Sequence, residues 1–166
     1  FLPQAGKVLT EGQPAPPNRM FPKIGLVFQY PEHQLFAETV YEEIAFAPRN
    51  HGLSEKQTEK AVAAAMAEVG LAKSFAGRSP FSLSGGEKRR VAIAGILAAG
   101  VDTLIFDEPT AGVDERGRNF IVGLAQKEHQ KGKTIIWISH DMDEVAQIAQ
   151  RVLVIDQGHL LMDGSP

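Results

Sequence analysis

The sequence predicts an α/β fold in which a mostly parallel β-sheet is flanked by helices and carries a helical subdomain. Three observations lead to this prediction. Short apolar runs alternate with helical stretches after residue 84, the pattern of a parallel sheet covered on both faces. Residues 39–69 contain no strand signal, so they predict a helical insertion. Polar residues directly follow several apolar runs, at the places where such sheets bind ligands.

Size and composition fit one compact domain. The chain has 166 residues and a net charge of −3, so bulk electrostatics give no support to a nucleic-acid partner. It contains no cysteine, which excludes disulfides and cysteine-based metal sites. No apolar run reaches the roughly 18 residues that a membrane-spanning helix needs.

The first 23 residues predict a remnant of an N-terminal β-region followed by a connector. Lys7–Thr10 has the composition of a short strand, and the proline-rich stretch Gly12–Asn18 predicts an exposed connector. From Ile24 to Phe28 the chain is apolar, which predicts a buried strand that ends at Gln29.

The main core is expected over residues 24–166, with the helical subdomain at about residues 37–98. Two pairs have the spacing of a capping box at a helix start: Thr39 with Glu42, and Ser54 with Gln57. Gly70 is the expected stop of the second helix. A third helix is expected to begin at Ser84 and to end near Gly100.

The remaining elements follow in alternation. We expect strands at Thr103–Phe106, Thr134–Ser139 and Val152–Ile155, helices at Asp114–Lys131 and Met142–Ala149, and a final strand at Leu160–Met162 paired with the preceding one.

The segment Ser84-Gly85-Gly86-Glu87 at the start of the third helix has the chemistry of a phosphate site. A serine cap followed by two glycines leaves backbone N–H groups accessible, and the helix dipole adds partial positive charge. The same spacing of Ser84 and Glu87 is that of an ordinary capping box, and the segment alone does not distinguish the two interpretations.

An acidic pair, Asp107-Glu108, follows the apolar strand that begins at Thr103. One carboxylate at such a strand end can hold Mg²⁺, and its neighbour can activate a water molecule for attack on phosphorus. The alternative is a solvated turn that Pro109 terminates.

Gln29 and His140 occupy similar positions after two other apolar runs. The Gln29 amide can contact a metal and a water, and the His140 imidazole can donate a hydrogen bond to a terminal phosphate. Taken singly, Gln29 and His140 are each also compatible with an ordinary surface residue that has no role in binding. The other histidines show no metal-ligand spacing.

The order of these motifs resembles the ATP-binding-cassette (ABC) ATPase family over residues 24–164. The matching elements are Gln29 as the Q-loop, Leu83–Glu87 as the LSGG signature, Asp107-Glu108 as the Walker B acid and catalytic glutamate, Ala111–Asp114 as the D-loop, and His140 as the H-loop histidine.

Within that family the chain is similar to the ATPases of energy-coupling-factor transporters, which take up vitamins and transition metals. Three stretches carry this resemblance: Phe28–Phe36, Thr39–Phe46 and Glu87–Ala94.

The resemblance implies a role for each site residue. Glu108 is the general base, His140 contacts the terminal phosphate, and Gln29 senses metal and water. Asp107 and Gln29 are the metal ligands. The expected nucleotide-binding residues are Ser84, Gly85, Gly86, Glu87 and Asp114.

The same resemblance implies cofactors and partners. ATP and Mg²⁺ are the expected cofactors. A second ABC ATPase subunit, identical or related, is expected to sandwich the nucleotides, with Asp114 linking the two sites. A transmembrane transporter subunit is expected to contact the surface from Gln29 to Phe36, where Leu35 and Phe36 are candidate contacts or, alternatively, core residues. The location implied is the cytoplasmic face of the membrane, as a peripheral subunit.

One family element has no counterpart in this sequence. A P-loop requires G-x-x-x-x-G-K-[ST], and the nearest matches, at Gly6-Lys7 and Gly132-Lys133-Thr134, do not fit it. The chain resembles a cassette that begins just after the P-loop helix. We therefore expect an incomplete P-loop NTPase-like core with an exposed sheet edge, which by itself does not turn over ATP.

Two other functions are compatible with the family resemblance. A cassette ATPase of DNA repair would carry a long coiled coil between Gln29 and Ser84, and one of translation would favour basic surfaces. The sequence has neither feature. A non-catalytic binding module would not require Glu108 and His140, so the presence of both residues argues against this alternative.

Overall fold

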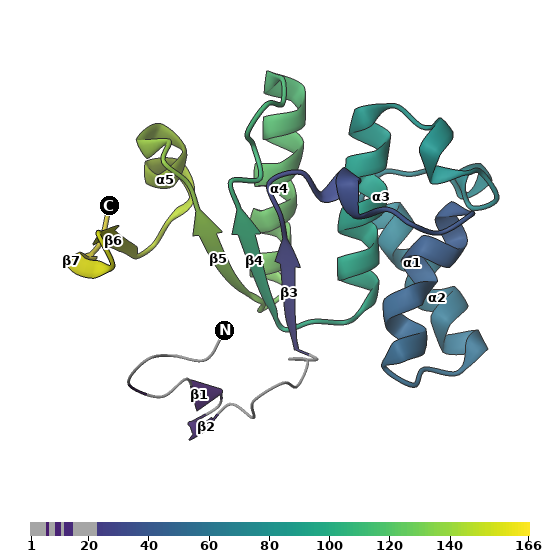
Figure 1. The fold of residues 1–166 in the computed structure, drawn as a ribbon, viewed down its shortest axis with the longest axis horizontal. Coiled ribbons are helices and arrows are strands. Elements are labelled where there is room, and N and C mark those ends of the chain that lie inside the picture. The colour runs from purple at the N-terminus through teal and green to yellow at the C-terminus, as the bar shows by residue number, and fades with distance from the viewer. Residues whose placement is uncertain (1–5, 7–8, 11, 15–22) are drawn as a thin grey trace.

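A parallel three-stranded sheet lies at the centre of the computed structural model, which describes residues 6, 9–10, 12–14 and 23–166. Its strands are β3 (Ile24–Val27), β4 (Thr103–Asp107) and β5 (Thr134–Ile138), in the order β3-β4-β5 (Figure 1). Phe106 of β4 lies between Val27 and Trp137 in the register. The predicted parallel α/β sheet is confirmed.

The helices also lie where the sequence predicts them. Between β3 and β4 the chain forms α1 (Val40–Asn50), α2 (Glu55–Glu68) and α3 (Gly85–Ala98), together with the short 3₁₀ helices η1 (Pro31–Gln34), η2 (Lys73–Phe75) and η3 (Pro80–Ser82). Helix α4 (Glu115–Gln130) connects β4 to β5, and α5 (Met142–Ile148) follows β5. In Figure 1, α1, α2 and α3 pack together beside the sheet.

The two capping boxes predicted at the starts of α1 and α2 differ in outcome. The Ser54 N–H donates to Gln57 Oε1 at 2.9 Å, as expected. Thr39 Oγ1 accepts from the Glu42 N–H at 3.1 Å, but the Glu42 carboxylate pairs with Arg49 instead of returning to Thr39. A charged partner is the stronger competitor for a carboxylate, so only half of the first capping box forms.

Among the described residues, helices cover one face of the sheet, whereas the sequence predicts cover on both faces. Leu104 and Phe106 of β4 are fully buried against the helices. On the opposite face Leu26, Ile136 and Ile138 are 37%, 45% and 47% exposed. The reason lies in the strand order. Both crossovers step in the same direction across the sheet, and right-handed crossovers in one direction place their helices on one side.

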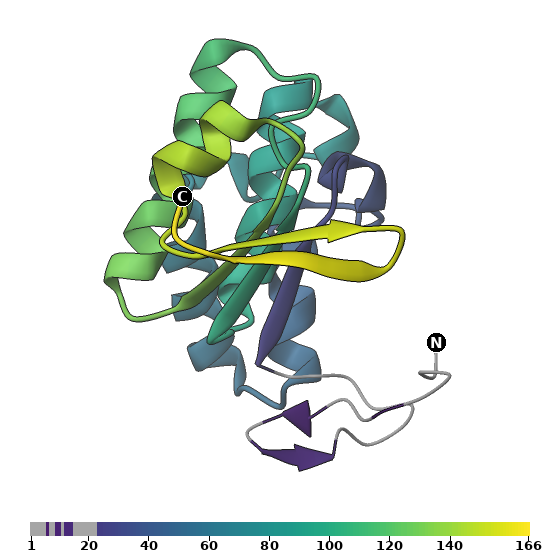
Figure 2. The same cartoon turned by 90° about the vertical axis from the view of Figure 1, so that its left-hand side faces the viewer.

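The C-terminal strands form a separate hairpin. β6 (Val152–Asp156) pairs antiparallel with β7 (His159–Gly164), as predicted, but this two-stranded sheet does not join the parallel one. Figure 2 shows the yellow hairpin running across the direction of the three central strands, and in Figure 1 it lies to one side of β5. Its apolar side chains are largely exposed, including Leu153, Ile155, Leu160, Leu161 and Met162.

A second small hairpin precedes the parallel sheet. β1 (Leu9–Thr10) pairs antiparallel with β2 (Gln13–Pro14). The second half of the strand predicted at residues 7–10 is therefore present as β1. Residues 7–8, its first half, lie outside the described residues. Part of the predicted connector, Gln13–Pro14, is a strand instead, and residues 15–18 of the connector are also outside the described part.

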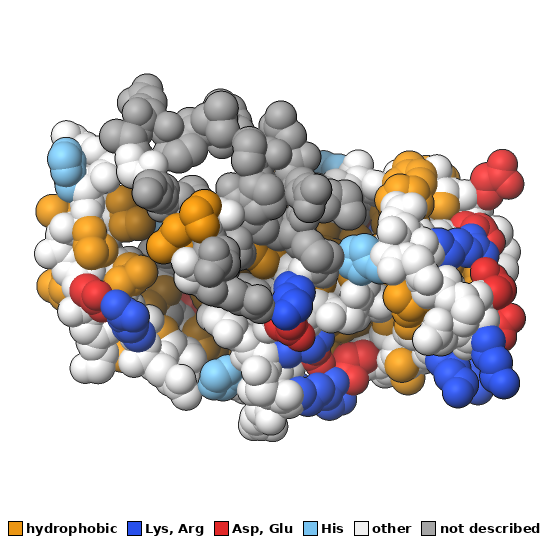
Figure 3. All heavy atoms as spheres, turned by 90° about the horizontal axis from the view of Figure 1, so that it is seen from below, with side chains coloured by type: hydrophobic (Ala, Val, Ile, Leu, Met, Phe, Trp, Pro, Cys, Tyr) orange, Lys and Arg blue, Asp and Glu red, His pale blue; other side chains and the backbone are white. Residues whose placement is uncertain are grey.

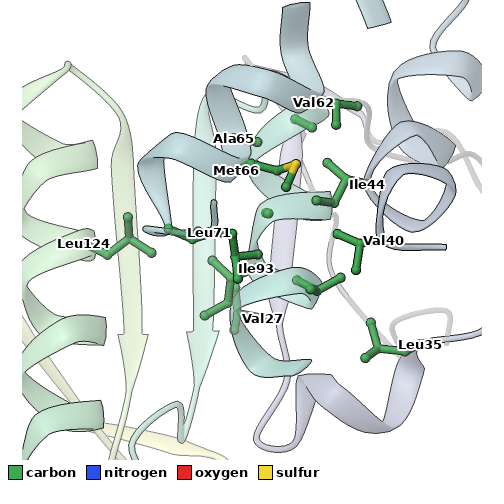
Figure 4. Packing of buried hydrophobic residues seen from close by; sticks show 14 of the residues in the cluster. Val27, Leu35, Val40, Ile44, Val62, Ala65, Met66, Leu71, Ile93 and Leu124 are labelled. Atoms are coloured by element: carbon green, nitrogen blue, oxygen red, sulfur yellow. The ribbon is translucent and has the colours of Figure 1, made fainter. Parts of the chain in front are cut away.

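The buried core joins the helices to the sheet. Side chains from α1, α2, α3 and β3 converge in Figure 4, among them Ile44, Val62, Met66, Ile93 and Val27. The closest approach is at Gly25, where a Cβ atom would lie 2.5 Å from Cγ2 of Ile96 on α3. Glycine at this position lets α3 pack directly on β3. This contact helps to set where α3 lies relative to the strands.

The surface differs between the two ends of the molecule. Figure 3 shows acidic and basic side chains gathered over the end formed by α1 and α2, and more hydrophobic side chains at the end formed by the β6–β7 hairpin. Among the residues that the structure describes, no helix is both long enough and apolar enough to cross a membrane.

Candidate functional site

The ends of the three parallel strands bring four predicted site residues to one edge of the sheet. Val27, Phe106 and Trp137 are aligned, so the residues that follow them leave the sheet side by side. Gln29 follows β3, Asp107 closes β4 with Glu108 directly after it, and His140 follows β5. The structure therefore assembles residues from positions far apart in the sequence, as the strand-end argument predicts.

Glu108 and His140 are in direct contact. Glu108 Oε1 lies 2.7 Å from Nδ1 of His140 and accepts the His140 backbone N–H at 3.1 Å. The Glu108 backbone has a φ of 46°, in the left-handed region, and its N–H donates to the Ile138 carbonyl at 2.9 Å. The chain thus turns sharply after β4 and directs the carboxylate toward the end of β5.

The contact with Glu108 also changes the titration of His140. The hydrogen bond to the Glu108 carboxylate raises the pKa of His140 above its usual value, and the attraction between the two charges adds to this effect. The imidazole side chain is 88% exposed and that of Glu108 24% exposed, so solvent weakens the interaction.

Asp107 and Gln29 supply oxygen donors beside this pair. Asp107 is partly buried at the end of β4, and Gln29 is exposed at the end of β3. Among the described residues there is no group of three or more histidine, cysteine, aspartate or glutamate side chains that could hold a metal ion unaided. One or two carboxylate or amide oxygens do fit Mg²⁺, because this ion commonly takes its other ligands from water and substrate phosphates.

The amino end of α3 forms a second group of predicted site residues. Ser84 caps the helix: its N–H donates to Glu87 Oε2 at 2.8 Å, and Ser84 Oγ accepts the Glu87 N–H at 3.4 Å. The hydrogen bonds from Ser84 lower the pKa of the Glu87 carboxyl. The predicted capping box is confirmed, and it leaves the backbone of Gly85 and Gly86 exposed.

The two glycines of this segment are not required by packing within the described chain. A Cβ atom placed at Gly85 or at Gly86 would have no atom within 4 Å, and neither residue has a positive φ. No atom crowds these two positions, and exposed backbone N–H groups at a helix start suit a phosphate group.

Asp114 lies across a cavity from this segment. The cavity has a volume of about 440 Å³, and Gly85, Gly86, Asp114 and Phe120 are among its lining residues. Asp114 also caps α4, because its Oδ1 accepts the Gly117 N–H at 2.8 Å. The predicted site residues therefore fall into two groups, one at the strand ends and one around the amino end of α3, and Glu108 and His140 do not line this cavity.

Sequence reasoning missed one residue that touches both regions. Arg89 is 7% exposed and contacts Glu32 and the main chain of Gln29 and Pro109. A signal for it existed. Arg89 lies four positions before the buried Ile93, so it shares the inward face of α3, where a charged side chain requires partners.

Comparisons with known proteins agree with this geometry. The pattern of the family described as "ABC transporter" matches residues 1–111. The energy-coupling factor transporter ATP-binding protein EcfA2 of Symbiobacterium thermophilum is 46% identical over 169 residues, which covers 99% of this chain and 59% of that protein. EcfA2 of Caldanaerobacter subterraneus is 51% identical over 145 residues, covering 87% of this chain and 51% of that protein. The chain thus spans little more than half the length of these curated relatives.

A solved structure has the same fold. It is cbiO1 from Clostridium perfringens, described as part of the ABC transporter complex cbiONQ. The TM-score is 0.86 at 34% sequence identity, and the match covers 99% of this chain and 68% of that chain.

Proposed function

This chain belongs to the ABC transporter family, and from that premise we propose that it forms part of the ATP-binding and ATP-hydrolysing subunit of an energy-coupling-factor-type transporter. The subunit drives uptake of a substrate. The observation that carries the proposal is the assembly of Gln29, Asp107, Glu108 and His140 at adjacent ends of three parallel strands, with Glu108 and His140 2.7 Å apart.

Glu108 is the general base of the proposed reaction. Its carboxylate is held by His140 through Oε1, which leaves Oε2 to accept a proton from water. The sharp turn at Glu108 keeps this carboxylate outside the sheet, where a phosphate can approach. His140 presents the rest of its exposed ring to the same space and donates to the terminal phosphate of ATP.

Asp107 and Gln29 are the residues that hold Mg²⁺ in this proposal. Both offer oxygen atoms at neighbouring strand ends, which suits a hard cation. Bound Mg²⁺ supplies positive charge that offsets the charge of the phosphates. Ser84, Gly85, Gly86 and Glu87 act on a different nucleotide in this proposal, since Glu108 does not line the cavity beside Gly85 and Gly86.

A second ATPase subunit supplies that nucleotide. The exposed residues Gly85 and Gly86, with no atom within 4 Å of their Cβ positions, are suited to close over ATP held by the opposite subunit. Asp114 faces the same cavity and connects the two sites across the interface. Each subunit thereby completes the site of the other.

A transmembrane subunit is the other proposed partner, at the cytoplasmic face of the membrane. Phe36 is 59% exposed and packs edge-on against Phe46, which is 50% exposed, with ring centroids 4.9 Å apart. These rings form an apolar surface for a partner helix. For Leu35 the sequence left a partner contact and a core position open, and at 7% exposed it belongs to the core.

The test compares ATP hydrolysis by the full-length gene product, assembled with its transmembrane partner, in wild type and Glu108→Gln. We expect Mg²⁺-dependent hydrolysis that falls about 100-fold or more in the variant, because the general base is removed while ATP binding is retained. Glu59→Gln, an exposed carboxylate on α2, is the matched control and should behave as wild type. Wild-type hydrolysis that survives Glu108→Gln would refute the assignment.

A further inference from the structure

Arg89 lies one turn into α3, between the two groups of predicted site residues. It is a charged residue with only 7% of its surface exposed. A guanidinium removed from water to this degree requires both a counter-charge and hydrogen-bond acceptors. The contacts that meet this requirement come from two other parts of the chain.

The counter-charge is Glu32 on η1, the segment that follows Gln29. Arg89 Nε donates to Glu32 Oε2 at 3.1 Å, and Nη2 donates to Oε1 at 3.3 Å. The side chains of Arg89 and Glu32 are 9% and 18% exposed. This two-point contact fixes the plane of the guanidinium, because both oxygens of the carboxylate are engaged.

The remaining donors of Arg89 contact the main chain beside the candidate catalytic residues. Nη2 donates to the Gln29 carbonyl at 3.2 Å, where β3 ends. Nη1 donates to the carbonyl of Pro109, the neighbour of Glu108, at 3.2 Å. One planar group therefore links the chain after β3 to the turn after β4.

We infer that Arg89 is a positioning residue for the proposed ATPase reaction, because its guanidinium sets the separation between the Gln29 segment and the turn that carries Glu108. The inference rests on the proposed function. Arg89 touches neither the Gln29 amide nor the Glu108 carboxylate, so it acts through the main chain.

The same contacts connect the two groups of site residues. Gly85 and Arg89 are one helical turn apart on α3, which is a rigid spacing. A displacement of the amino end of α3 is therefore carried by Arg89 to both strand ends. Hydrolysis is sensitive to such displacements, since about 1 Å of misplacement can cost about 100-fold in rate.

The test replaces the planar guanidinium of Arg89 by another group and keeps its positive charge. In the full-length gene product assembled with its transmembrane partner, Arg89→Lys retains a cation for Glu32 but cannot contact Gln29 and Pro109 at the same time. We expect kcat for ATP hydrolysis to fall about tenfold or more. The Kd for ATP should stay within about twofold of wild type, because the lost interaction acts on geometry in the reacting state.

Arg151→Lys is the matched control. Arg151 makes the same two-point contact, with Nε and Nη2 at 2.7 and 2.6 Å from the two oxygens of Asp163, but on an exposed hairpin. Its kcat should equal that of wild type.

Glu32→Gln provides a second variant should Arg89→Lys disturb folding. It keeps the shape of the side chain and removes the charge that orients the guanidinium, so kcat should also fall at nearly unchanged Kd. The double variant should be no slower than the slower single variant, because both changes release the same contact.

Two results would overturn the inference while leaving the proposed function intact: wild-type kcat in Arg89→Lys and Glu32→Gln, or losses of kcat matched by equal losses of ATP affinity. A wild-type protein without Glu108-dependent hydrolysis would instead remove the proposed function and the inference with it.

Discussion

Glu108 Oε1 and His140 Nδ1 lie 2.7 Å apart at the adjacent ends of β4 and β5. The contact is sustained by main-chain geometry as well, since the Glu108 N–H is bonded to the Ile138 carbonyl and the His140 N–H to the Glu108 carboxylate. The candidate general base is therefore held in place by contacts within the chain, and its partner is a side chain that can gain or lose a proton.

The pKa of His140 should depend on Glu108. In the purified chain, NMR titration of the imidazole should give a pKa above the usual histidine value, and Glu108→Gln should lower it. Asp141→Asn should lower it less, because Asp141 acts only through a weaker charge attraction. Equal pKa values in wild type and Glu108→Gln would contradict the contact.

The contact between His140 and Glu108 also makes the stability of the fold depend on pH. A pKa raised on folding means that the pair stabilises the fold fully below the unfolded-state pKa of His140, and this contribution disappears as pH rises through the raised folded value. Urea unfolding across that range should show a steeper loss in wild type than in Glu108→Gln.

Gly25→Ala should destabilise the chain by about 1–3 kcal/mol, because the added methyl group overlaps Ile96 in a close-packed contact between β3 and α3. Gly123→Ala in α4 is the matched control. No atom lies within 4 Å of its added Cβ, so it should stabilise by about 0.5–1 kcal/mol. Urea midpoints measure both changes, and equal effects of the two substitutions would count against the packing described here.

Glu128→Gln should cost about 2 kcal/mol of stability at neutral pH, because the Glu128 side chain is only 3% exposed and bonded to Lys131 and Lys133. Burial favours a higher pKa for Glu128, but the hydrogen bonds from the two lysines outweigh it and lower the pKa. The contribution is therefore present above the unfolded-state pKa of glutamate and is lost as pH falls through the lowered folded value.

Urea unfolding at neutral and acid pH measures this effect. The difference between wild type and Glu128→Gln should shrink in acid, while Glu59→Gln, an exposed control on α2, should show little difference at either pH. A difference for Glu128→Gln that is independent of pH would exclude the ion pairs as its cause.

The purified 166-residue chain should bind ATP weakly and should not hydrolyse it. Its sequence has no G-x-x-x-x-G-K-[ST] segment, so it lacks the amide cradle and lysine that hold the β-phosphate in P-loop enzymes. Phosphate release measured with Mg²⁺ and ATP should equal that of the Glu108→Gln chain. Turnover that is abolished by Glu108→Gln would show that other residues hold the nucleotide.

Most elements of the fold could be predicted from the sequence, because their signals are local. Apolar runs mark β3, β4 and β5, and capping residues mark the starts of α2 and α3. The grouping of Gln29, Glu108 and His140 could be predicted as well, since parallel strands place their carboxyl ends at one edge.

Other features depend on contacts that no local pattern contains. For Leu35 the sequence left an exposed contact and a core position open, and only the packing decided for the core. Leu26 and Ile136 have the same apolar character as Val27, but within the described part of the chain the strand order puts no helix on their face of the sheet. The hairpin of β6 and β7 matches the predicted strands and still does not join the central sheet.

By itself the sequence determined which segments are helices and strands and which polar residues end the strands, because short-range sterics, capping and periodicity act within a few residues. Only the tertiary structure decided that Arg89 contacts Gln29, Glu32 and Pro109, and that Glu108 turns toward His140. Those contacts join positions 20 to 60 residues apart, and their geometry depends on how the crossovers and helices pack as a whole.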